Sequence, residues 1–278
     1  MSAAGLRLAC RLALALALAG CAGAPERSRA EREALEANRH AARAFEAGRL
    51  DEARSLYAQA LKLDLAVENT DGIAVNLLSL ARVAQAAGRP QEAHAALDRV
   101  LDAIPPAAPA RQAEAAARKA QLFLGAGQSA PAAQWSERAG RLCAQSGCSA
   151  LASILNLRAM AALREGDPER ALSWSRQAMG VAGTRAEHAN ALRVSAEAHL
   201  ARREPDPARQ AAEDALALDR SLGLPPRVYR DLMLLGRSND ALGRRAEARA
   251  YYQRALTVAG ASDDADAVRE ARAARDAR

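Results

Sequence analysis

The sequence is poor in the residues that build β-sheets. Phe, Trp and Tyr together make up 3% of its 278 residues, Val, Ile and Thr are sparse, and Ala and Leu supply most of the apolar half. Ala and Leu lead the scale of helix propensity, whereas β-branched and aromatic residues favour strands. The composition therefore predicts an all-α fold in which helices pack closely through small side chains.

Patterns that carry catalysis or bind metals are also missing. The sequence has no nucleophile-elbow, phosphate-loop or dinucleotide-binding fingerprint. Its acidic clusters, Glu68/Asp71 and Asp263/Asp264, fall in expected loops or helix ends, where solvated carboxylates are common. The four histidines show no metal-ligand spacing and are His40, His94, His188 and His199. We therefore expect no catalytic residue, no metal, no cofactor and no enzymatic activity.

A short apolar run near the amino terminus is the first positive feature. Residues 12–19 alternate Leu and Ala, follow Arg7 and Arg11, and precede the first acid, Glu26. The run is too short for a membrane-spanning helix, which takes about 20 apolar residues, but it suits the core of an export signal. Residues 1–20 are thus predicted to be a signal peptide. Their removal takes away two Arg and no acid, which lowers the net charge from +6 to +4.

The end of this run resembles the lipobox of bacterial lipoproteins, at Leu18, Ala19, Gly20 and Cys21. By that resemblance, the chain is cut before Cys21, which becomes diacylated on its sulfur and acylated on its new amino terminus. Several acyl chains hold a protein on a membrane far better than one. The alternative is ordinary cleavage that leaves Cys21 an incidental thiol. Ala22 is not the Asp that retains many lipoproteins in the inner membrane, so the resemblance implies a lipid anchor in the outer membrane of the bacterial cell envelope, facing the periplasm.

Self-similarity organises the rest of the chain. Segments 47–63, 87–103, 165–181 and 242–258 share a Gly followed five residues later by an Ala, and segments 126–142 and 202–218 are weaker copies. The six aligned turn positions are Gly48, Gly88, Gly127, Gly166, Arg203 and Gly243. Glycine there allows the left-handed backbone that ends a helix, and a repeated Ala lets two helices approach closely. Each copy therefore predicts a helix pair, and neighbouring pairs must stack to cover their apolar stripes.

These copies resemble the tetratricopeptide repeat, a helix–turn–helix unit. The resemblance covers residues 33–260 and implies a right-handed α-solenoid of about six repeats. Their spacing is 37–40 residues, compared with about 34 in the family, and Pro- and Gly-containing stretches between the pairs account for the extra length. Residues 21–32 are expected to be the lipidated Cys and a tether. Residues 261–278 are expected to form a capping helix or a frayed tail.

Two further cysteines, Cys143 and Cys148, fall between the third and fourth repeats. In an exported chain such a close pair suggests a structural disulfide. Two free thiols are the alternative. The spacing is not the C-x-x-C of redox-active pairs.

A stack of such repeats offers a concave surface lined by the first helix of each pair. Carrying the family's groove positions onto this chain gives Asn38, Arg82, Gln85, Gln121, Asn156, Arg164, Arg193, Glu197, Arg230, Arg237 and Asp240. Five of these are Arg and two are acidic, and guanidinium groups pair well with carboxylates. The groove is therefore predicted to bind an extended peptide. The alternative is that each residue is simply part of a solvated helix face.

Three classes of function remain. The first is a membrane-anchored scaffold that binds another envelope protein or a peptide segment of it, as similar lipoproteins do in pilus, secretin or outer-membrane assembly; a related alternative is an adaptor for peptidoglycan hydrolases or synthases. The second, an enzyme of envelope polymers, lacks room for a catalytic domain. The third, nucleic-acid binding through Arg, is disfavoured by export. We predict the scaffold, without nucleic acid, and homo-oligomerisation stays open.

Overall fold

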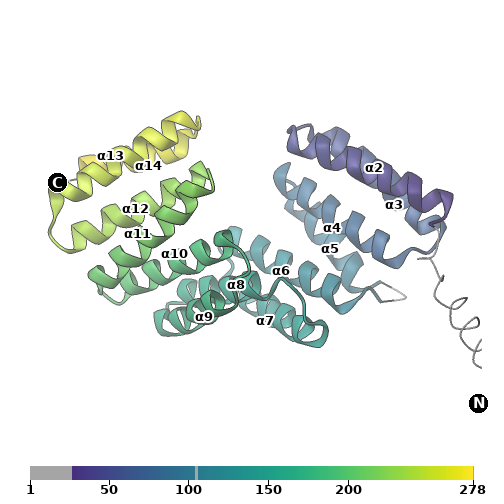
Figure 1. Cartoon of the computed structure of the whole chain (residues 1–278), viewed down its shortest axis with the longest axis horizontal. Helices are drawn as coiled ribbons and strands as arrows, with labels where there is room; N and C mark the ends of the chain where they lie inside the picture. The colour runs from purple at the N-terminus through teal and green to yellow at the C-terminus, as the bar shows by residue number, and fades with distance from the viewer. Residues whose placement is uncertain (1–26, 104–105, 278) are drawn as a thin grey trace, which may run out of the picture. The chain divides into compact units, whose positions relative to one another are not determined.

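The computed structural model describes residues 27–103 and 106–277, which are largely helical (Figure 1). Within those residues there are thirteen helices and no strand. The helices are α2 (Arg29–Glu46), α3 (Leu50–Ala66), α4 (Thr70–Ala86), α5 (Pro90–Leu101), α6 (Pro109–Gly125), α7 (Ser129–Ser146), α8 (Leu151–Arg164), α9 (Pro168–Val181), α10 (Arg185–Ala201), α11 (Pro205–Ser221), α12 (Pro225–Ala241), α13 (Arg245–Ala261) and α14 (Ala265–Asp276). The first twelve form six successive helix pairs, so the predicted all-α repeat architecture is confirmed.

Local sequence sets where many of the helices begin. Ser28 and Thr184 each accept a hydrogen bond from the backbone three residues on, and Glu31 and Glu187 return the bond to the cap residue. Such capping boxes satisfy donors that the first helical turn leaves unpaired. Several other helices start with Pro, whose missing N–H is harmless at that position.

The turn inside each pair contains one residue with left-handed backbone. φ is positive at all six aligned turn positions, namely Gly48, Gly88, Gly127, Gly166, Arg203 and Gly243. Glycine adopts this conformation without the steric cost of a Cβ atom. Arg203 adopts it as well, with φ of 62°. The predicted turn positions are therefore correct even where the residue is not glycine.

Small side chains fill the contacts between helices. The repeated residues of both helices in each pair are at most 3% exposed, and include Ala41, Ala81, Ala120, Ala159, Ala196, Ala53, Ala93, Ala132, Ala171, Ala208 and Ala248. In α12, the first helix of the sixth pair, the equivalent residue is Gly236. A Cβ atom added there would lie 2.2 Å from Cε1 of Tyr252. Only a residue without a side chain permits this approach of α12 to the Tyr252 ring.

The chain divides into two compact units, with the boundary between Asn76 and Leu77 inside α4. In the first unit α2 packs on α3, and Asn76 near the start of α4 is hydrogen-bonded to a side chain from each. In the second unit each helix from α5 to α13 packs on its successor.

The first helices of the pairs form one side of the second unit. In addition to their own partners, α6 contacts α8, α8 contacts α10, and α10 contacts α12. Among the described residues, no comparably extensive contact joins successive second helices, α7, α9, α11 and α13. A stack whose members touch on one side only curves toward that side. The helices α6, α8, α10 and α12 therefore line the inner wall of this unit.

The predicted signal peptide and the lipobox residues Leu18 to Cys21 lie outside the described residues. None of the helices in the described part of the chain combines the length and apolarity needed to cross a bilayer. At the other end, α14 packs on α13, with Ala267 and Ala271 buried, and Asp264 caps its first turn.

Candidate interaction surfaces

All eleven residues predicted to line the groove lie on first helices. Seven are exposed, namely Arg82, Gln85, Gln121, Arg164, Arg230, Arg237 and Asp240. Asn38 and Glu197 are partly buried. Arg82, Gln121 and Arg237 occupy the same position in their repeats, six residues before the left-handed turn residue. The second unit therefore carries a polar row, rich in Arg, on its first helices.

The other two predicted groove residues, Asn156 and Arg193, are 4% and 5% exposed and do not form an open surface. The amide of Asn156 donates to the backbone carbonyl of Glu187 at 3.1 Å, which joins α8 to the start of α10. This interaction is structural. The register of the repeat correctly places Asn156 and Arg193 on first helices. It does not predict which side chains or backbone groups of neighbouring helices they contact.

Arg193 is the centre of a buried charge cluster. Its Nε donates to Oδ1 of Asp231 at 2.7 Å, its Nη2 is paired with Oδ2 of Asp219, and its Nη1 donates to Asn190 at 2.8 Å. The side chains of both Asp residues are fully buried. Arg193 thus ties α10 to α11 and α12, and its expected role in a solvent-exposed groove is corrected to an internal one.

Two fully buried carboxylates share the guanidinium of Arg193 in this cluster. The pKa of Asp231 is raised to about 7, chiefly by burial; Arg193 opposes the rise, and the nearby Asp219 carboxylate adds to it. A second cation, Arg227, lies 3.8 Å from Oδ1 of Asp219.

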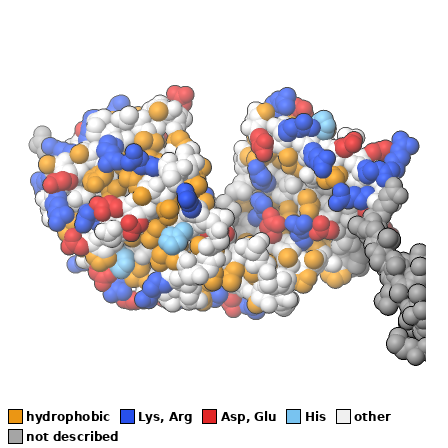
Figure 2. All heavy atoms as spheres, viewed as in Figure 1, with side chains coloured by type: hydrophobic (Ala, Val, Ile, Leu, Met, Phe, Trp, Pro, Cys, Tyr) orange, Lys and Arg blue, Asp and Glu red, His pale blue; other side chains and the backbone are white. Residues whose placement is uncertain are grey.

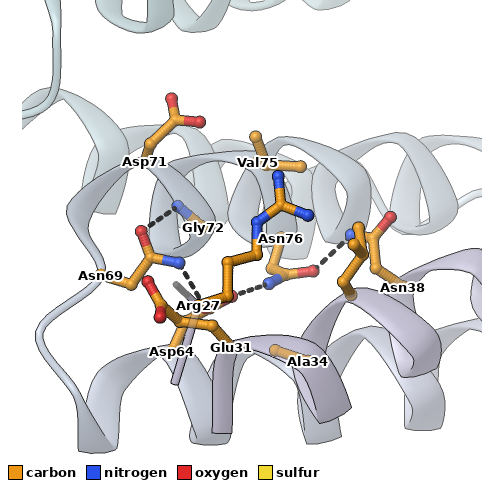
Figure 3. A pocket seen from close by; sticks show the side chains of 11 residues that line it. Arg27, Glu31, Ala34, Asn38, Asp64, Asn69, Asp71, Gly72, Val75 and Asn76 are labelled. Atoms are coloured by element: carbon orange, nitrogen blue, oxygen red, sulfur yellow. Dashed lines mark hydrogen bonds between the residues drawn. The ribbon is translucent and has the colours of Figure 1, made fainter. Parts of the chain in front are cut away.

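A polar pocket lies in the first unit, between α2, the end of α3 and the start of α4 (Figure 3). Its volume is about 280 Å³, and it is lined by Arg27, Glu31, Ala34, Leu35, Asn38, Asp64, Asn69, Asp71, Gly72, Val75 and Asn76. Asn69 and Asn76 each donate an amide hydrogen bond of 2.7 Å to Asp64, one to each carboxylate oxygen. Asn38 in turn donates to Oδ1 of Asn76 at 2.7 Å.

Asp64 is 3% exposed, although it is a charged residue. Burial raises its pKa, and the Glu31 and Asp71 carboxylates add to the rise. The hydrogen bonds from Asn69 and Asn76 act in the opposite direction. Neutral amides, rather than a cation, are therefore the groups that hydrogen-bond to this carboxylate.

Sequence reasoning missed Asp64 and Asp219 as buried charges. Both lie sixteen residues after the turn residue of their repeat, a position that holds Cys143, Ala182 and Ala259 in other repeats. An acid at a position that is otherwise small or apolar was the signal that could have revealed them.

Cys143 and Cys148 form a disulfide in the structure, with Cα atoms 5.0 Å apart. It joins the end of α7 to the turn that leads into α8, and Cys143 is 2% exposed. Within the described residues, no group of three or more His, Cys, Asp or Glu side chains is arranged to hold a metal ion.

Side chains of both charge signs are interspersed on the face of each unit shown in Figure 2. Neither sign forms a continuous patch on that face. The charge on that face is therefore mixed and not of one sign.

Comparison with known proteins agrees with this geometry. Sequence profiles of the tetratricopeptide repeat match residues 32–105 and again residues 232–261. The chain contains tetratricopeptide repeats. No curated protein sequence matches it significantly.

Solved structures of tetratricopeptide-repeat proteins and others have the same fold. Pseudomonas aeruginosa PilF superposes with a TM-score of 0.62 at 15% identity, covering 88% of this chain and 99% of PilF. BtubC from P. vanneervenii gives 0.59 at 20% identity, covering 85% and 93%. The thermophilic TPR protein TTC0263 of Thermus thermophilus gives 0.57 at 23% identity, covering 72% and 98%. At these identities the similarity concerns the fold, and it confirms the predicted α-solenoid class.

Proposed function

We propose that this protein is a scaffold of the bacterial cell envelope, which binds a segment of another envelope protein along its first helices. Tetratricopeptide repeats are a fold of protein-interaction scaffolds, and the repeats extend over nearly the whole described chain. The proposal therefore rests on the surface that the stacked helices present.

The observation that carries this proposal is the set of exposed arginines on first helices. Arg82, Arg164, Arg230 and Arg237 are four of the seven exposed residues of the predicted groove, and only one of the seven is acidic. An arginine fork can bind a carboxylate through two parallel hydrogen bonds. It also donates to backbone carbonyls, so the row fits an extended segment that contains acidic residues.

Charge reversal tests this surface directly. The full chain would be crosslinked in intact cells, purified from membranes, and its partners identified by mass spectrometry. We expect Arg82→Glu/Arg164→Glu/Arg230→Glu/Arg237→Glu to lose a partner that the wild type captures. Arg193 is left unchanged because its side chain is internal, and its replacement would disturb the fold.

The matched control reverses four exposed arginines on second helices, Arg99→Glu/Arg141→Glu/Arg176→Glu/Arg220→Glu. This variant has the same net charge as the test variant. Circular dichroism would show that both remain helical. If the variant with reversed charges on its first helices still captures the partner, or if the control variant loses the partner equally, the proposed surface is wrong. The captured partner would also decide between pilus or outer-membrane assembly and the alternative of peptidoglycan hydrolases or synthases.

The lipid anchor is a second part of the proposal and rests on the lipobox resemblance at residues 18–21. Cells supplied with an alkyne analogue of palmitate should label the wild-type chain but not the Cys21→Ser variant. Cys10→Ser is the control, because it removes a thiol that the predicted cleavage discards. Labelling that persists in Cys21→Ser would refute lipidation at this residue.

The proposed outer-membrane location rests on Ala22. In density-gradient fractions of the envelope, wild type should follow outer-membrane markers, whereas Ala22→Asp should shift toward the inner membrane. A wild-type chain found with inner-membrane markers would contradict the location, but not the interaction surface.

A further inference from the structure

The pocket of the first unit and the buried Arg193 cluster occupy equivalent places in two pairs of neighbouring repeats. Asn38 and Arg193 both lie ten residues before their turn residue, Gly48 or Arg203. Asp64 and Asp219 both lie sixteen residues after it.

The third residue of each cluster also occupies an equivalent position in its repeat. Asn76 and Asp231 both lie twelve residues before the next turn residue, Gly88 or Gly243. The same arrangement of a first helix, a second helix and the next first helix is therefore built twice in this chain, with different side chains.

Two arginines occupy the later arrangement. The guanidinium of Arg193 contacts both Asp219 and Asp231, and Arg227 approaches Asp219 while donating to the carbonyl of Ala186 at 3.2 Å. The earlier arrangement has the shorter Asn38 in place of Arg193 and Gly72 in place of Arg227. Both of these shorter residues line the pocket of about 280 Å³.

Gly72 is adapted to this arrangement. A Cβ atom at this residue would lie 2.4 Å from Cγ and Oδ2 of Asp64. The backbone of α4 therefore lies directly against the Asp64 carboxylate, and the Gly72 N–H donates to Oδ1 of Asn69 at 3.2 Å. This close packing keeps the buried carboxylate fixed at the pocket.

The charge of the lining favours a cation. Three acidic residues, Glu31, Asp64 and Asp71, line the pocket, compared with one basic residue, Arg27, among the lining residues that the structure describes. The pKa of Glu31 is lowered chiefly by its hydrogen bonds with the backbone N–H and the side chain of Ser28, and the charge of Arg27 adds to this. The Asp64 carboxylate accepts its side-chain hydrogen bonds from the neutral amides of Asn69 and Asn76, and a buried carboxylate gains most from a cationic partner.

We propose that this pocket binds the guanidinium of an arginine side chain from a partner polypeptide, with Asp64 as its charge partner and Asn38 and Asn76 as neighbouring polar contacts. A planar guanidinium suits the site because the equivalent positions in the later repeats already hold one against two carboxylates. The biological use of the pocket rests on the proposed interaction role, but binding of arginine to it does not depend on the envelope location or on the exposed arginine row.

The probe is the peptide acetyl-Gly-Arg-Gly-amide, with acetyl-Gly-citrulline-Gly-amide as its neutral counterpart. Each would be titrated into the isotope-labelled full chain in a mild nonionic detergent, with the side-chain amide signals of Asn38, Asn69 and Asn76 observed by NMR. The arginine peptide should shift these signals and bind about tenfold or more tightly than the citrulline peptide, because only arginine makes a charge-assisted bond. Equal binding of both peptides, or no shift of the three amides, overturns the proposal.

Two variants separate pocket binding from general effects. Asp64→Asn should weaken arginine-peptide binding about tenfold, whereas Glu36→Gln, the same loss of charge at an exposed residue of α2, should leave it unchanged. Unchanged binding in Asp64→Asn overturns the proposal.

The second variant, Asn38→Arg/Asn76→Asp, reproduces the three residues of the Arg193 cluster and should fill the pocket. It should therefore remove binding while the chain stays helical. A helical variant that still binds the peptide overturns the proposal even if Asp64→Asn fails to fold. Loss of partners in the charge-reversal experiment tests the proposed function separately, since those residues do not line this pocket.

Discussion

Arg193→Met would test the buried charge cluster most directly. Methionine keeps much of the length of the arginine side chain but removes the cation that two fully buried carboxylates share. Removing one partner of a buried ion pair costs about 3–5 kcal/mol. Since a typical domain is stable by about 5–15 kcal/mol, we expect a large fraction of the free energy of unfolding to be lost.

The size of this loss should depend on pH. Asp231 has its pKa raised to about 7 by burial, so at pH 5.5 it can be protonated and the variant carries one buried charge fewer. Because Arg193 lowers the pKa of Asp231 in the wild type, the Asp231 carboxyl of the variant must at pH 8 either keep its proton or ionise without its partner. Urea unfolding of wild type and Arg193→Met at the two pH values, followed by circular dichroism, should show the larger difference at pH 8.

Two comparisons complete this test. Arg237→Met removes an exposed arginine from the next first helix and should change stability by no more than about 0.5 kcal/mol. Arg193→Met/Asp219→Asn/Asp231→Asn removes the stranded charges and should regain more than half of the loss. If Arg193→Met is as stable as Arg237→Met, the cluster is not an important source of stability and the reasoning is refuted.

Three other predictions concern the fold. Gly236→Ala should lower the free energy of unfolding by about 1–3 kcal/mol, because its Cβ meets the Tyr252 ring at 2.2 Å; a urea midpoint equal to wild type would contradict this. Asp231→Asn should flatten the pH dependence of stability: protonation of Asp231 favours the folded state below its unfolded pKa of 3.8, and this contribution is lost as pH rises through about 7. Identical pH profiles in urea unfolding would exclude it. Cys143→Ser/Cys148→Ser should lower stability by about 2 kcal/mol, the chain-entropy value for a short loop, and wild type measured under reducing conditions should match the variant.

Much of the fold was predictable because it depends on local patterns. The positions of Ala and of the turn residues recur along the chain, and a helix pair needs only such a pattern to be recognised. Arg203 shows the strength of this signal, because the turn forms there with a left-handed arginine at φ of 62°. The six pairs were therefore predicted correctly from their spacing.

The groove was predicted less completely. Arg82, Gln121 and Arg237 are exposed as expected, but Arg193 and Asn156 occupy the same kind of helix and are buried. Exposure at a groove position depends on which side chains the neighbouring helices present. For Arg193 those are acids that follow it by 26 and 38 residues, a distance over which a local pattern carries no information.

The sequence by itself determined the helical class, the repeat, the turn positions and the small residues at helix contacts, because each of these depends on the intrinsic preference of a few neighbouring residues. Only the tertiary structure decided which polar residues became internal ties and which remained at a surface. It brought Asn38, Asp64 and Asn76 together at a pocket, and placed Arg193 between Asp219 and Asp231 at the equivalent position. The cost of burying a charge depends on every group that surrounds it, and that set exists only when three helices have packed.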